Sequence, residues 1–135
     1  MFYDFAVTVP AGTPESAPVE QEINLTSGQI QKVHILFPPG PHGLVKVRIF
    51  DGGHQYLPTN PDGYFWSDDE VVKAEDEAYD LSGAESMKIL AYSPGTSYDH
   101  TIGVRVSISR PDELTAKNPL VAGLQSLLKL IGVGG

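Results

Sequence analysis

The stretch QIQKVHILFPPGPHGLVKVRIF, residues 29–50, decides the fold that this chain is expected to adopt. It contains two runs in which every second residue is apolar, and a segment rich in proline and glycine, residues 38–43, separates them. The apolar residues are Val33, Ile35 and Phe37 in the first run and Val45, Val47 and Ile49 in the second. Alternation of period two is typical of a β-strand with one buried face. The stretch therefore predicts a β-hairpin at the centre of the domain.

Runs with the same alternation continue on both sides of this hairpin. They cover residues 3–9, 19–25, 87–91 and 102–108, and a further short strand is predicted over 54–57. Asp51-Gly52-Gly53 is a strong turn signal, because glycine accepts positive φ freely, and it predicts that residues 54–57 pair back on 45–50. Short strands with turn residues between them predict an all-β fold, an antiparallel β-sandwich or jelly-roll-like domain.

The pattern changes near the C-terminus, where a short amphipathic helix is predicted. Asn118 and Pro119 suit the first positions of a helix, and Gly132 suits its end. The aliphatic residues that follow Pro119 recur at helical spacing and form a predicted protein interface. They are Leu120, Val121, Leu124, Leu127, Leu128 and Ile131. We therefore expect a β-domain over residues 1–111 and a spacer with the helix over 112–135; the sequence leaves open whether the helix packs on its own domain or on another subunit.

Composition excludes several classes of function. The chain has 135 residues, no cysteine and a net charge of −8. A nucleic-acid partner is not expected, because such binding needs clustered Lys and Arg to neutralise phosphates. A membrane partner is not expected either, since no apolar run reaches the roughly 20 residues of a spanning helix. Without cysteine there is neither a disulfide framework nor a thiolate metal site.

The acidic stretch 62–80 holds eight of the seventeen carboxylates. A calcium ion prefers six to eight oxygen ligands, so this stretch raises an alternative in which the domain binds calcium or a carbohydrate. The residues of that alternative site are Asp62, Trp66, Asp68, Asp69 and Glu70. The spacing does not match an EF-hand loop. The competing interpretation is a solvated acidic face: residues 68–80 would form either a short helix or a charged edge strand that discourages edge-to-edge pairing.

No pattern of catalytic residues stands out, and we expect a protein that is not an enzyme and needs no cofactor. The four histidines are far apart in the sequence, which disfavours a zinc site. Ser97, Asp99 and His100 are crowded into one turn, and a catalytic triad is defined by geometry that this spacing does not suggest. Aromatic residues could form a carbohydrate platform or protein-interface anchors. They are Tyr56, Tyr64, Phe65, Trp66, Tyr79, Tyr92 and Tyr98.

Several segments together resemble small structural proteins of tailed bacteriophages. They are TPESAPVEQEINLT (13–26), VHILFPPGPHGLVKVRIFDGGHQYLPTNPDG (33–63), YSPGTSYDHTIGVRVSISRP (92–111) and the Leu-rich tail. The resemblance implies a non-enzymatic virion component that decorates or stabilises a capsid, or joins virion parts, through protein–protein contacts. It also implies a homo-oligomer, capsid or other virion proteins as partners, and a location in the virion after synthesis in the host cytoplasm.

Overall fold

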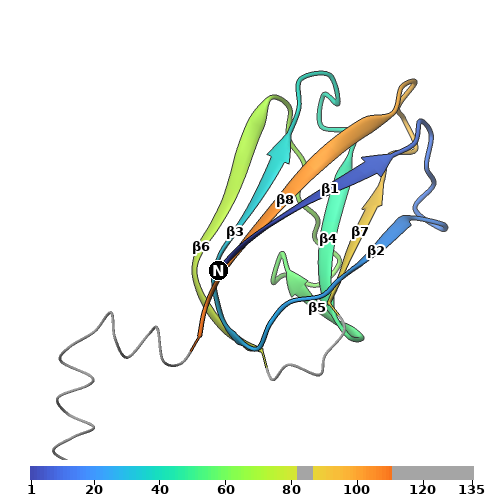
Figure 1. Cartoon of the computed structure of the whole chain (residues 1–135). Helices are drawn as coiled ribbons and strands as arrows, with labels where there is room; N and C mark the ends of the chain where they lie inside the picture. Colours follow the sequence, from blue (N-terminus) through green and yellow to red (C-terminus); the bar gives the residue numbers. More distant parts are fainter. Residues whose placement is uncertain (82–86, 111–135) are drawn as a thin grey trace, which may run out of the picture.

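The computed structural model describes residues 1–81 and 87–110, and within them the chain forms eight β-strands in two sheets (Figure 1). The strands are β1 (Phe2–Val9), β2 (Val19–Ile23), β3 (Gly28–Phe37), β4 (Lys46–Asp51), β5 (His54–Leu57), β6 (Glu70–Leu81), β7 (Met87–Tyr92) and β8 (His100–Ser109). Sheet A has the order β1-β8-β3-β6, and sheet B has the order β2-β7-β4-β5. All strand pairs are antiparallel. The predicted all-β, antiparallel fold is confirmed.

Both sheets contribute to a single hydrophobic core in a sandwich-like arrangement. In β8, the alternate residues Ile102, Val104, Val106 and Ile108 are buried, and the intervening residues face outward. Buried residues of β3 and β4 belong to the same cluster. Each fully buried aliphatic side chain stabilises the fold by about 1.5–3 kcal/mol relative to an exposed one. Alternation in the sequence therefore reports correctly which face of each strand is buried.

The predicted central hairpin is wrong. The strands β3 and β4 do not pair; β3 pairs with β8 and β6 in sheet A, whereas β4 pairs with β7 and β5 in sheet B. Residues 38–45 cross from one sheet to the other, and facing sheets lie about 10 Å apart. Strands that face each other across a core show the same alternation as strands that pair, so the pattern alone could not separate the two arrangements. The hairpin predicted at 51–53 is confirmed, since β4 pairs with β5.

The acidic stretch forms the edge strand β6, so the edge-strand alternative is confirmed over the helix for residues 70–81. The strand is irregular: its register with β3 shifts between Ile30 and Lys32, and Ala78 has a φ of 45°. A charged, distorted strand is a poor template for pairing with another chain. Sheet A is therefore protected along its β6 side.

The predicted C-terminal helix and its interface residues, 120–131, lie outside the described residues, as does the predicted domain boundary at 111–112. No α-helix occurs in the described part of the chain. Within that part, no helix has the length and apolar character needed to cross a membrane.

Candidate interaction surface

Four connections meet at the end of the sheets where β1, β3 and β7 finish, at the top of Figure 1. We call this region the loop end; it comprises residues 10–18, 38–45, 65–69 and 93–100. Hydrogen bonds join its segments. The Ala11 amide donates to Asp99 Oδ1 at 2.8 Å, and the Ser93 amide donates to the Thr13 carbonyl at 2.8 Å. The loop end is thus held by contacts between segments that are far apart in the sequence.

Asp68 fixes the long connection between β3 and β4. Its Oδ1 accepts hydrogen bonds from the backbone amides of Gly40 and His42, both at 2.9 Å. The pKa of Asp68 lies below its ordinary value, chiefly because the His42 amide donates to the carboxylate, and the Gly40 amide adds to the effect. His42 itself has a φ of 51°, which is uncommon for a residue other than glycine. The ionised carboxylate holds this backbone in place.

Large apolar side chains project from the loop end into solvent. The exposed fractions are 40% for Leu44, 60% for Trp66 and 78% for Tyr98. Trp66 lies against Gly43, where a β-carbon would come within 3.0 Å of the indole ring, so the glycine makes room for the indole. Leu44 and Tyr98 border a hollow of about 250 Å³. Its other lining residues are Gly40, His42, Gly95, Thr96, Ser97 and His100.

The turn that contains Ser97, Asp99 and His100 is part of this surface. Asp99 accepts the hydrogen bond from Ala11, so its carboxylate braces the connection between β1 and β2. The His100 ring lies beside Gly40. Within residues 1–81 and 87–110, no hydrogen bond links these three side chains to one another. Asp99 is therefore a bracing residue of this turn.

A second hollow, of about 440 Å³, lies on the outer face of sheet B. It is lined by Glu15, Lys46, Arg48, Asp62, Tyr64, Tyr92 and Pro94. Lys46 Nζ lies 5.4 Å from the centroid of the Tyr64 ring, and Arg48 Cζ lies 5.7 Å from that of Tyr92. A cation over the face of an aromatic ring is attracted electrostatically by the ring, and this attraction helps to order both side chains. Burial raises the pKa of the Tyr92 hydroxyl above its ordinary value.

Arg48 connects three segments around this second hollow. Its Nε donates to the Gly63 carbonyl at 3.0 Å, and one terminal nitrogen donates to the Asp62 carbonyl at 3.2 Å. The same nitrogen lies 3.8 Å from a carboxylate oxygen of Glu15. The guanidinium therefore joins β4 to the segment after β5 and to the connection after β1.

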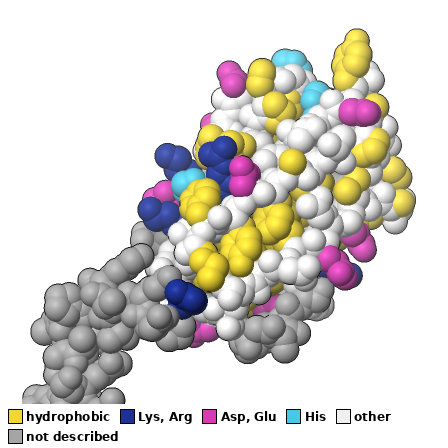
Figure 2. All heavy atoms as spheres, viewed as in Figure 1, with side chains coloured by type: hydrophobic (Ala, Val, Ile, Leu, Met, Phe, Trp, Pro, Cys, Tyr) yellow, Lys and Arg dark blue, Asp and Glu magenta, His cyan; other side chains and the backbone are white. Residues whose placement is uncertain are grey.

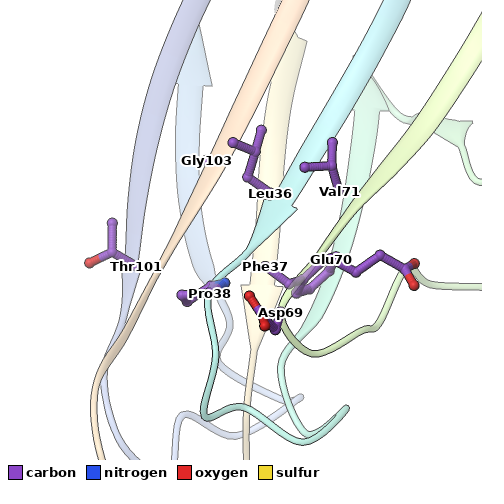
Figure 3. Close-up of a pocket in the computed structure, with 8 residues that line it drawn as sticks. All are labelled: Leu36, Phe37, Pro38, Asp69, Glu70, Val71, Thr101 and Gly103. Atoms are coloured by element: carbon purple, nitrogen blue, oxygen red, sulfur yellow. The ribbon is translucent and has the colours of Figure 1, made fainter.

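A third hollow, of about 390 Å³, lies on the outer face of sheet A next to the loop end (Figure 3). Leu36 of β3 pairs directly with Val71 of β6 and with Gly103 of β8, which makes an apolar row across three strands. Gly103 has no side chain, and a β-carbon there would lie 3.3 Å from Leu36. Asp69 and Glu70 line the hollow near the start of β6, and the Glu70 carboxylate points away from the other lining residues. The hollow borders the loop end, because Pro38 and Asp69 also line it.

The structure separates the residues of the predicted calcium or carbohydrate site. Trp66, Asp68 and Asp69 belong to the loop end. Asp69 also lines the hollow on sheet A together with Glu70, and Asp62 lies at the hollow on sheet B. No group of three or more His, Asp or Glu side chains suited to hold a metal ion occurs among the residues that the structure describes. The Asp68 carboxylate is instead engaged by backbone amides.

The aromatic residues also divide among different places. Trp66 and Tyr98 lie at the loop end, and Tyr64 and Tyr92 line the hollow on sheet B. Sequence reasoning missed Leu44, Lys46 and Arg48 as surface residues of interest. The sequence does indicate that Lys46 and Arg48 face outward, because they flank the buried Val47 in a strand. Which residues lie next to Lys46 and Arg48 on that face depends on the order of the strands in the sheet.

No protein-family model matches the chain, and no curated protein matches it. Among solved structures, the chain is similar to the crystal structure of FlhE, with a TM-score of 0.44 and 13% sequence identity, over 82% of this chain and 97% of that one.

Proposed function

We propose that the chain is a non-enzymatic structural protein that acts through protein–protein contacts, with the loop end as its contact surface. The observation that carries this proposal is the group of exposed Leu44, Trp66 and Tyr98 side chains on loops that hydrogen bonds hold in place. Tryptophan and tyrosine are the residues that most often dominate the binding energy of protein interfaces. Because the loops are already braced, a partner has little backbone to order on binding.

The virion setting of this proposal comes from the sequence resemblance to tailed-phage proteins. We propose a β-sandwich that decorates or stabilises a capsid in many copies, with capsid or other virion proteins as partners. The acidic composition, with a net charge of −8, would favour a partner surface that is less acidic than the chain itself.

A photo-crosslinking experiment on purified phage particles tests this proposal. The variant Tyr98→p-benzoylphenylalanine is expected to assemble into particles and to form a crosslink to another virion protein. The matched control carries the same substitution at His54, which is exposed at the start of β5. Equal crosslinking from both positions would contradict the loop end as the contact surface. Absence of the chain from purified particles would contradict the virion role.

The alternative function is carbohydrate binding, and the hollow on sheet B favours it. Tyr64 offers an aromatic ring, while Lys46, Arg48 and the carboxylates of Glu15 and Asp62 offer donors and acceptors of the kind that sugar hydroxyls require. Saturation-transfer NMR with maltose, cellobiose and chitobiose tests this function. It predicts a signal that Tyr64→Ala abolishes and Tyr98→Ala leaves intact. No signal from any of the three sugars would count against it.

A further inference from the structure

The strand β1 has one unpaired side. It lies at the edge of sheet A and pairs only with β8. Within the described residues, no backbone group bonds to its other side. An edge strand of this kind presents a row of free N–H and C=O groups, which is a template for pairing with another strand.

The hydrogen-bond phase of β1 shows which residues present those groups. Met1 and Ile108 exchange two backbone bonds, of 2.6 and 2.7 Å. The register runs without a shift from Phe2 opposite Ser107 to Val9 opposite His100. Because bonded and non-bonded pairs alternate in an antiparallel ladder, the odd-numbered residues bond to β8. Phe2, Asp4, Ala6 and Thr8 therefore direct their N–H and C=O groups to the free side.

This edge lacks the protection that the opposite edge of the sheet has. The sequence of β1, FYDFAVTV, has eight residues, one charge and neither proline nor glycine. Phe2 is 63% exposed, and Tyr3 and Phe5 are half-buried with their rings stacked at 5.9 Å. Figure 2 shows hydrophobic side chains in a diagonal band over the side of the molecule where β1 runs in Figure 1. By contrast, β6 is acidic and irregular.

We propose that two copies of this chain associate by antiparallel pairing of β1 with β1, about a two-fold axis at Phe5. In this register, Phe2 pairs with Thr8 of the second copy, and Asp4 pairs with Ala6 of the second copy. Each of the four bonded pairs exchanges two hydrogen bonds, so all the free groups of residues 2, 4, 6 and 8 are satisfied. The two A sheets become one continuous sheet with closed two-fold symmetry.

Only this register uses the whole edge. A shift of the axis to Asp4 places two carboxylates directly opposite each other, and like charges in that position are destabilising. A shift to Ala6 brings Pro10 opposite Phe2, where proline has no N–H to donate.

The strand is thus complementary to itself, and this favours a second copy as the partner. Its one charge, Asp4, lies 3.7 Å from Arg105 of its own chain and faces an alanine of the other copy. The paired strand also shields Tyr3 and brings Phe5 against Phe5 in a non-bonded pair, where side chains approach most closely. The inference concerns contacts between copies and does not depend on the loop end binding a partner.

A pair of charge variants at one position tests the register. Ala6 is exposed, so Ala6→Asp and Ala6→Lys should both leave the monomer folded, which circular dichroism checks. In the dimer, Ala6→Asp puts a carboxylate opposite Asp4 twice and should raise the dissociation constant about tenfold, measured by sedimentation equilibrium. Ala6→Lys should leave it unchanged or lower it. Equal effects of the two variants, or a monomeric wild-type chain, would overturn the proposal.

Single cysteines give a second test, which the cysteine-free sequence makes clean. In the proposed dimer the two Phe5 α-carbons lie about 4.5 Å apart, within the range of a disulfide. Phe5→Cys should therefore crosslink copies under mild oxidation. The control Ala6→Cys has its second-copy counterpart on the diagonal, about 7 Å away, and should crosslink at least several-fold more slowly. Faster crosslinking of Ala6→Cys would show a different register and overturn the proposed one.

Discussion

The Asp68 carboxylate organises the exposed loop end from a single position. It receives two backbone amides from a connection that carries Pro38, Pro39 and Pro41, and proline itself has no amide to donate. His42 adopts a positive φ in this connection, a conformation with a modest energetic cost for residues other than glycine. The two hydrogen bonds offset that cost. Neither partner amide is recognisable from the sequence, because both are backbone groups more than twenty residues from Asp68.

Asp68→Ala is expected to lower the free energy of unfolding at neutral pH. The folded-state pKa of Asp68 is lowered, so its contribution is complete above the unfolded value of 3.8 and is lost as the pH falls through the folded value. Urea midpoints of wild type and variant should therefore differ at pH 7 and converge in acid. The control is Glu70→Ala, a neighbouring exposed carboxylate, which should have little effect. A difference that does not change with pH would show that the carboxylate charge is not the cause.

At the scale of the elements, alternation predicted the strands well and their pairing poorly. Seven of the eight observed strands overlap runs that the sequence marked as strands, and the remaining one, β6, was among the stated alternatives. The error at β3 and β4 arose because alternation reports a buried face and not a hydrogen-bonded neighbour. Pairing between β3 and β8 joins residues more than sixty positions apart, which no local pattern encodes.

The candidate surface was also only partly predictable from the sequence. Trp66, Asp68 and Tyr98 were recognisable as residues of interest, because aromatic residues are frequent interface anchors and carboxylates are rarely buried unless paired. Their grouping was not, since it depends on which connections end at the same side of the two sheets. Leu44 was not recognised as a surface residue of interest, although it is 40% exposed and lines the same hollow as Tyr98. The order of the strands places the three loops that carry these residues at the same end of the two sheets, where they form one surface.

At the scale of the whole molecule, two segments of the chain are candidates for holding copies of it together. The sequence predicts that the aliphatic residues of 120–131 form an interface, whereas the structure offers the free edge of β1. Among the described residues, all eight strands pair within residues 2–109, and both sheets contribute buried residues from that range to the core. Removal of the segment after Arg110 therefore separates the two explanations.

A chain that ends at Arg110 is expected to stay folded and to form the same dimer as the full chain, because β1 and its free edge are unchanged. Its loss of stability should be below about 1 kcal/mol, a fall in Tm of about 4 °C or less for a domain of this size. Light scattering on a sizing column gives the two masses, and thermal unfolding gives Tm. The Ala6→Asp substitution in the shortened chain is the control, and it should shift the mass toward that of a monomer. If the shortened chain is a folded monomer while the full chain is an oligomer, the segment 111–135 holds the copies together and β1 does not. If the shortened chain is unfolded, that segment contributes to the stability of the domain itself.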